Sequence, residues 1–559
     1  MRRLLELSVL LPAIALAAIG LAMWGWAEHA RQLDLSTLDI LYRSLSAVTV
    51  SSLYDDSHSW RGDLRLEIAR MLGAIAFFTT VLGALTQLLR REVREAFARL
   101  RRGHVIVIGD HPVARAIAET AAQRKAKATW IAGEGADHSA AGVLTVQRRW
   151  DVETVGAFAA RHAEHIVVAL RDEVEQLATV RALRAAVPEV PICVSIRDPW
   201  FADRLDAIED VADVRYISPV GLAIRRLHDR NPPFLIARAL GQPRLHALML
   251  GGGRAGEAVL NDLLLSQSTS FLGAPRVTVI DPRANEIAAS FAQRAPDLYL
   301  SADLRFVAPD HAHDVRALPL AALREAQADC PFTLAYVSLD SDARTIRAAV
   351  ALQLRARRDG WPMGPIYARL SAPGAFPGLA ENRTIGTAAA LVSWGDTHDL
   401  ADEIGLFGGE ADRLPRAFHE AYRRLAPEGA AHNQPWDALN QAARESNRQL
   451  MVHMPAKLAS IGVDVAAWLA ATNDGPRRRR PPPTPDLNAD PELLERVAAL
   501  EHTRWLSEKR LCGWQHGGAR DNARRLHPAL VPWEALGEHD RAFNRAMVAA
   551  MTAALGAAA

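Results

Sequence analysis

The chain has 559 residues and a formal net charge of +1, so no overall charge points to nucleic acid as a partner. Hydrophobic residues make up 49% and charged residues 23%, as in ordinary folded proteins, which excludes a disordered chain. At about 150 residues per domain, the length predicts three or four soluble units besides a membrane segment. The three cysteines lie far apart, which excludes a disulfide framework and a CxxC metal site and suits a reducing cytoplasm.

Two uncharged apolar runs stand out in the first hundred residues, Leu7–Trp26 and Met71–Leu89. A bilayer core about 30 Å thick needs about 20 helical residues, so each run is long enough to cross once. Arginines precede the first run and follow the second, which places both termini in the cytoplasm. Residues 1–98 are therefore predicted to be a two-pass hairpin in the bacterial inner membrane. The alternative for the first run is a cleaved signal peptide, but no clear small-residue cleavage site follows it.

The loop between the runs carries an apolar stripe at helical spacing. Its members, Leu38, Leu41, Leu45 and Val48, predict a short α-helix that re-enters the membrane, because irregular backbone survives at that depth only inside protein or beside water. The order of span, short helix, Thr-Val, Tyr, Asp and span resembles the two-span pore of tetrameric potassium channels, whose filter reads T-V-G-Y-G-D. The residues at the filter positions are Thr49, Val50, Ser51, Ser52, Leu53, Tyr54, Asp55 and Asp56.

This resemblance implies a homotetramer that lies in membrane lipid and passes monovalent cations through its pore. The chain departs from the filter pattern at both glycines, which allow successive carbonyls to line a pore, so potassium selectivity is not implied. Asp55 and Asp56 near the outer mouth would still favour cations. The alternative is a membrane-anchor hairpin with an amphipathic loop and no pore.

Residues 99–240 alternate short β-rich runs with helical runs, which predicts a parallel, doubly wound α/β sheet. Gly109 follows the first strand in a phosphate-loop pattern that keeps one glycine of three. The stretch 103–235, which begins HVIVIGDHPVARAIAE, resembles the RCK (TrkA-N type) domain, a Rossmann-like regulator of potassium conductance. The expected strands are His104–Ile108, Ala128–Ile131, Ile166–Leu170, Ile192–Ser195 and Val214–Ile217.

Residues 241–405 predict a second unit of the same kind. The strand Leu245–Leu250 leads into a complete G-x-G-x-x-G made by Gly251, Gly253 and Gly256, and the next strand ends in Asp281, where such folds place a ribose-binding acid. Gly251 would allow the tight turn, Gly253 the close approach of a phosphate, and Gly256 close helix packing. The pattern predicts a bound nucleotide or NAD(H); the alternative is that the glycines keep the turn with nothing bound. Other expected strands are Arg276–Ile280, Leu334–Leu339, Ile366–Leu370 and Leu391–Trp394.

The C-terminal third is predicted to be helical and internally repeated. The motif P-W-D-A-L at 435–439, followed by S-N-R at 446–448, returns 97 residues later as P-W-E-A-L and F-N-R. Self-similarity of this kind indicates duplicated structural units. The proposed units, 406–475 and 487–559, are separated by an Arg/Pro-rich linker at 476–486, whose composition is typical of a solvated connection.

The second copy reads E-H-T-R-W at 501–505, C-G-W at 512–514 and H-P-A-L-V-P-W at 527–533. This pattern closely resembles the RyR domain, the repeat of ryanodine receptors that also occurs in bacterial proteins, and the first copy looks like a divergent partner. The resemblance implies a small nucleotide-type ligand, with tryptophan faces for a base and guanidinium groups for phosphate. The alternative is that the tryptophans form the core of a small domain. The candidate residues are Arg504, Trp505, Trp514, His527, Trp533, Asn544 (usually Asp in the family) and Arg545, with Trp436, Asn447 and Arg448 in the first copy.

Together these features predict a ligand-gated cation channel with RCK-like and RyR domains, which could serve as a stress or antiphage effector. One alternative is a membrane-anchored regulatory subunit of a separate transporter. Another is an NAD(P)-dependent enzyme that uses the glycines of the second unit. The sequence shows no nucleophile elbow, HExxH motif or metal cluster, so no catalytic or metal-binding residues are predicted.

Overall fold

The computed structural model forms two compact units, Met1–Arg99 and Leu100–Ala559. The predicted filter, residues 49–56, lies outside the described residues, as does most of the Arg/Pro-rich linker. The residues described are 2–46, 63–133, 143–150, 155, 158, 160–198, 201, 214–309, 319–371, 389–395, 400–406, 412–425, 433–439, 441–473 and 482–558.

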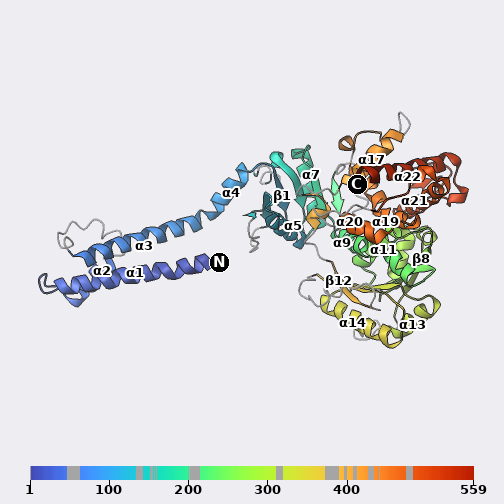
Figure 1. The fold of residues 1–559 in the computed structure, drawn as a ribbon. Helices are drawn as coiled ribbons and strands as arrows, with labels where there is room; N and C mark the ends of the chain where they lie inside the picture. The colour runs from blue at the N-terminus through green and yellow to red at the C-terminus, as the bar shows by residue number, and fades with distance from the viewer. Residues whose placement is uncertain are drawn as a thin grey trace. The chain divides into compact units, whose positions relative to one another are not determined.

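The first unit is a helical hairpin. Helices α1 (Arg2–His29) and α3 (Leu64–Leu88) pack side by side, with α2 (Thr37–Ser46) against α1, and α4 (Arg90–Leu100) follows (Figure 1). The contact is close because small residues face it: a Cβ atom at Gly25 would lie 2.6 Å from Leu66. Its core consists of Ala22, Trp26, Leu66 and Ala69.

The predicted membrane hairpin is supported in part. Among the described residues, one helical segment, Leu64–Leu85, has the length and composition of a membrane span, and only 17% of its most apolar window is buried. α2 occupies the position of the predicted re-entrant helix, and its apolar side chains Leu38, Leu41 and Leu45 are exposed. The two-pass topology, the cytoplasmic termini and the re-entrant insertion stay predictions.

The second unit begins with a parallel six-stranded sheet. Its strand order is β3-β2-β1-β4-β5-β6, the doubly wound Rossmann order, and helices α5 (Pro112–Gln123), α7 (Glu173–Ala186) and α9 (Pro219–Arg230) connect or follow the strands. The strands are β1 (His104–Ile108), β2 (Ala128–Ala132), β3 (Leu144–Gln147), β4 (Ala163–Val168), β5 (Ile192–Ser195) and β6 (Arg215–Ile217).

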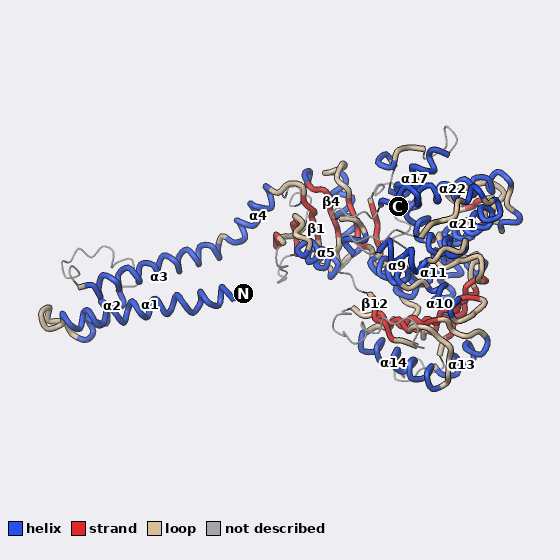
Figure 2. The backbone as a smooth tube through the Cα atoms, viewed as in Figure 1, coloured by secondary structure: helices blue, strands red, loops and turns tan. Residues whose placement is uncertain are grey.

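A second parallel six-stranded sheet repeats this order as β9-β8-β7-β10-β11-β12. Figure 2 draws its strands in red, with β12 labelled. Its helices are α10 (Pro233–Ala239), α11 (Arg254–Ser266), α12 (Ala284–Arg294), α13 (Leu320–Asp329) and α14 (Asp342–Arg358). Two doubly wound sheets are therefore confirmed. The strands are β7 (Arg244–Leu250), β8 (Gly273–Ile280), β9 (Asp303–Val307), β10 (Leu334–Val337), β11 (Ile366–Arg369) and β12 (Leu391–Trp394).

The predictions missed one edge strand in each sheet, β3 and β9. An edge strand has one neighbour, so it need not carry the continuous apolar run of a central parallel strand. In β9 the polar residues Asp303 and Arg305 interrupt the run, and both join ion pairs along the sheet edge.

Both predicted C-terminal repeats share one hydrophobic core. The helices are α16 (Leu400–Glu403), α17 (Arg413–Leu425), α18 (Gln441–Val452), α19 (Met454–Ser460), α20 (Val465–Asn473), α21 (Pro491–Leu511) and α22 (Glu538–Ala558). Phe418 and Leu450 from the first copy join Val497 and Val548 from the second, and Phe234 of α10 belongs to the same core. The boundary predicted at 475 thus divides residues that pack together.

Equivalent contacts reveal the repeat. His419 Nε2 bonds the carbonyl oxygen of Gln434 at 2.8 Å, two residues before Trp436, and His502 Nε2 bonds that of Val531 at 2.8 Å, two residues before Trp533. The two copies therefore build the same corner from a helical histidine and a P-W-x-A-L turn. Two more contacts recur at the same spacing: Arg444 to Asp437 and Arg541 to Glu534, and Asn447 to Ala443 and Asn544 to Asp540. Equivalent arginines also form ion pairs in both copies, Arg448 with Asp412 and Arg545 with Glu495.

Candidate functional site

The glycine loop of the second sheet connects β7 to α11. Gly251 has φ +99°, and a Cβ atom there would lie 2.1 Å from the carbonyl oxygen of Ser338. A Cβ atom at Gly256 would lie 2.7 Å from the carbonyl oxygen of Gly251. Both positions therefore exclude a side chain, one for the turn and the other for helix packing. Gly253 differs, because a Cβ atom there would meet nothing within 4 Å, so the loop is open at this residue.

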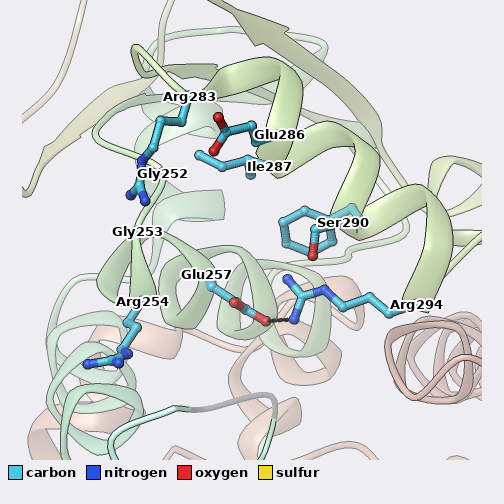
Figure 3. Close-up of a pocket in the computed structure, with 10 residues that line it drawn as sticks. Gly252, Gly253, Arg254, Glu257, Arg283, Glu286, Ile287, Ser290 and Arg294 are labelled. Atoms are coloured by element: carbon cyan, nitrogen blue, oxygen red, sulfur yellow. Dashed lines mark hydrogen bonds and ion pairs between the residues drawn. The ribbon is translucent and has the colours of Figure 1, made fainter.

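The N-terminus of α11 faces this opening. Gly253 is the N-cap residue and no side chain caps the helix, so the amides of the first turn are available to a ligand. Free amides and the positive end of the helix dipole together favour a bound anion. A cavity of about 210 Å³ lies between this turn and α12 (Figure 3), lined by Gly252, Gly253, Arg254, Glu257, Arg283, Glu286, Ile287, Ser290, Phe291 and Arg294.

Charged side chains from two helices and a loop surround the cavity. Arg254 and Arg283 are exposed at its rim, where they add positive charge near the helix terminus. Arg294, the last residue of α12, reaches across and forms an ion pair with Glu257 of α11 at 2.5 Å (Figure 3). The arginines suit phosphate, since guanidinium groups bind it through paired hydrogen bonds.

Asp281 lies where it was predicted, at the end of β8, but its carboxylate is already engaged. One oxygen accepts a hydrogen bond from the Gly252 N–H at 2.9 Å, and the other accepts one from the Arg283 N–H at 2.8 Å. The side chain is buried and ties the glycine loop to the start of α12. A ribose hydroxyl would have to donate to remaining lone pairs of this carboxylate.

The corresponding loop of the first sheet is closed to an anion. Gly109 has φ +125°, and a Cβ atom there would lie 2.1 Å from the carbonyl oxygen of Ala169, so this glycine serves the turn. The His111 ring accepts a hydrogen bond from the Val113 N–H at 3.3 Å, and Pro112 has no N–H. Burial lowers the pKa of His111, which favours the neutral, accepting ring. In the first Rossmann-like sheet, the side chain of His111 therefore caps the helix N-terminus, whereas the corresponding helix end of the second sheet is left open.

In the RyR-like segment, the structure brings the predicted aromatic residues together. The Trp505 ring lies 5.1 Å from that of His527 and 5.6 Å from that of His502, measured between ring centroids. Trp514 lies 6.3 Å from His527, and Trp533 lies 5.8 Å from His502. All three tryptophans are half-buried, so they combine packing with partly exposed ring faces.

The phosphate role predicted for Arg504 does not fit its position. Its side chain is 3% exposed and pairs with Glu501 at 2.8 Å and Glu508 at 2.7 Å. Glu501 also pairs with the buried Lys457 at 2.5 Å. The E-H-x-R-W pattern thus forms an internal charge network, since buried charges need partners.

Most other polar candidates in the two repeats are also engaged. Arg545 pairs with Glu495 at 3.0 Å and with Glu538, and Arg448 pairs with Asp412 at 2.7 Å. Asn447 and Asn544 each donate a hydrogen bond to a carbonyl one turn earlier in their own helix. Trp436 is buried. A ligand in this domain would therefore meet aromatic rings first, and its binding there stays a prediction.

Sequence reasoning missed the five charged residues of the cavity: Arg254, Glu257, Arg283, Glu286 and Arg294. Arg254 follows Gly253 directly and Arg283 lies two residues beyond Asp281, so the sequence alone could have predicted that both lie near the glycine loop. The pairing of Glu257 with Arg294 had no such signal, because the two residues are 37 positions apart in different helices and only the fold brings them together.

Fold and site together define a protein with two Rossmann-like units, one of which has an open glycine loop at an uncapped helix N-terminus. Residues 487–558 match the RyR domain family. The search of curated proteins found no significant match. One similar solved structure is GsuK bound to ADP, with 16% identity, coverage of 72% of this chain and 98% of that chain, and a TM-score of 0.37. A second is the GsuK channel bound to NAD, with 13% identity, coverage of 74% of this chain and 86% of that chain, and a TM-score of 0.37. Another is a dipicolinate synthase polypeptide from Bacillus halodurans (12%, 55% and 98%, TM-score 0.20). Likeness this distant carries no conclusion about what this chain binds.

Proposed function

We propose that the second Rossmann-like unit binds the phosphates of a nucleotide, such as ADP or NAD(H), and that this binding regulates the chain. The observation that carries the proposal is the uncapped N-terminus of α11 behind the open residue Gly253. Phosphate oxygens would accept hydrogen bonds from the first-turn amides, with Arg254 and Arg283 at the rim. Asp281 would accept from a ribose hydroxyl while it holds the loop.

Substitution of Gly253 tests this proposal. Its φ of −70° suits any residue, so Gly253→Ala should leave the fold intact while its methyl group occupies the phosphate approach. We expect the Kd for ADP, measured by calorimetry, to rise about tenfold or more, which corresponds to about 1.4 kcal/mol. Gly273→Ala, where the nearest atom would be 3.7 Å away, is the matched control. Unchanged binding to Gly253→Ala would place the nucleotide elsewhere.

We further propose that the whole chain is a nucleotide-regulated cation channel rather than an enzyme. In this proposal four copies assemble in the bacterial inner membrane, residues 49–56 form the filter, and the RyR-like aromatic cluster binds a second nucleotide-type ligand. The apolar α3 segment and the exposed stripe of α2 support a membrane location for the first unit. A stress or antiphage role would follow from such a ligand-controlled leak.

Ion flux in proteoliposomes tests the channel. Nucleotide should change the flux of K⁺ or Na⁺, Asp55→Asn should reduce it, and Trp505→Ala should alter its dependence on the second ligand. A reconstituted chain that conducts under none of these conditions would contradict the pore. The chain would then be a regulator of a separate transporter, an alternative favoured by the absence of both filter glycines from the sequence.

A further inference from the structure

The RyR-like segment forms hydrogen bonds with residues that follow the C-terminal end of α12. Arg510 donates a hydrogen bond to Ser301 Oγ at 3.0 Å, and Gln515 donates one to Asp297 at 3.4 Å. Between them, Gly513 has φ +75°, and a Cβ atom there would lie 2.6 Å from the carbonyl oxygen of Arg294. The C-terminal end of α12 is therefore packed directly against residues 510–515.

Arg294 connects this contact with the nucleotide cavity. Its backbone carbonyl meets Gly513, while its guanidinium group pairs with Glu257 inside the cavity and lies 4.3 Å from the centre of the Phe291 ring. Glu257 belongs to the first turn of α11, whose amides form the proposed phosphate site. One residue thus faces both the cavity and the RyR-like segment.

Phosphate would disturb the Arg294–Glu257 pair. The two side chains are only partly exposed, at 18% and 14%, so their attraction is less screened than on an open surface. A phosphate at the helix terminus brings negative charge close to Glu257 and offers Arg294 a competing partner. The backbone of Arg294 is packed against Gly513, so a change of partner that shifts the last turn of α12 also shifts its contact with residues 510–515.

We propose that Arg294 couples nucleotide binding at the glycine loop to the RyR-like segment through its ion pair with Glu257 and its contact with Gly513. The inference rests on the proposed nucleotide site and names its regulation. From Gly513 the path continues through Trp514 and His527 to Trp505, whose rings contact one another in turn. Since such coupling is reciprocal, a change at residue 513 must also alter affinity at the loop.

The test uses the full-length protein in nanodiscs, with ADP as the probe. Hydrogen exchange in peptides covering 510–516 should change when ADP binds, and Glu257→Gln should abolish that change because the pair is already weakened. Gly513→Ala should shift the Kd for ADP about fivefold or more, the lower range of coupling between sites, although residue 513 does not line the cavity. Gly518→Ala, with nothing within 4 Å of its Cβ position, is the control and should bind as wild type.

The outcomes separate the two proposals. Absence of ADP and NAD binding to the wild type would overturn the nucleotide site and the coupling with it. Binding without a change in exchange at 510–516, together with a wild-type Kd in Gly513→Ala, would overturn the coupling alone. Should Gly513→Ala unfold the RyR-like segment, seen as a loss of helical circular dichroism signal, the Glu257→Gln exchange experiment decides the question, because that variant leaves the 510–515 contact intact.

Discussion

Among individual residues, the buried charges of helices α19 and α21 form one connected group. Lys457, Glu501 and Arg504 are almost fully buried, and both cations pair with Glu501. Arg504 and Lys457 lower the pKa of Glu501 to about 2 despite burial. His453 lies beside this group, and its Nε2 bonds the Ser268 carbonyl oxygen at 2.7 Å. Burial and the neighbouring Lys457 lower the pKa of His453 to about 3.

His453 should therefore make the protein less stable in mild acid. Its pKa is about 3 when folded and near 6.5 when unfolded, so below pH 6.5 only the unfolded chain takes up the proton. The free energy of unfolding should fall as pH falls from 6.5 towards 3, by up to about 1.4 kcal/mol per pH unit. His453→Gln keeps a donor for Ser268 but removes this titration.

Denaturant unfolding of residues 100–559 between pH 7 and 5 measures the effect and avoids the lower range in which Glu501 titrates. The wild type should lose more stability than His453→Gln over this interval. The exposed His539→Gln is the control and should follow the wild type. Equal slopes for all three would show that His453 takes up a proton as readily in the folded chain as in the unfolded one.

At the scale of elements, the repeat pairs α17 and α18 with α21 and α22. α17 packs along α22, where the rings of Tyr422 and Phe543 lie 6.0 Å apart, centre to centre. Each copy alone would leave this face exposed to water. Duplication here builds one core from two halves rather than two independent domains.

The second copy by itself should not fold. A fragment of residues 482–559 lacks Phe418, Leu450 and Trp468, which fill the shared core, so its buried apolar area would be too small for stability. We expect circular dichroism to show no cooperative melting for this fragment, whereas residues 100–559 melt cooperatively. A sharp transition in the short fragment would make the RyR-like copy an autonomous domain.

At the scale of the whole molecule, the apolar hairpin and the proposed nucleotide site belong to different compact units. Every residue that lines the cavity lies within the second unit. Residues 100–559 expressed without the hairpin should therefore bind ADP with the affinity of the full-length chain, within about twofold, a difference of well under 1.4 kcal/mol. Calorimetry on both proteins measures this, and a large loss of affinity would show that the first unit contributes to the site.

The sequence by itself determined the two doubly wound sheets, the glycine loop and the repeat. These depend on local signals: central parallel strands are continuous apolar runs, and Gly251 occupies a backbone conformation that side chains disfavour. The edge strands β3 and β9 lacked such runs and went unpredicted.

Only the tertiary structure decided how the charged residues are used. Arg504 carries a guanidinium group, which is suited to phosphate, yet packing encloses it with Glu501 and Glu508. Arg294 gave no local signal, yet the fold places it between the cavity and Gly513. The partner of a long charged side chain depends on which helices meet, and contacts between residues distant in the chain determine that.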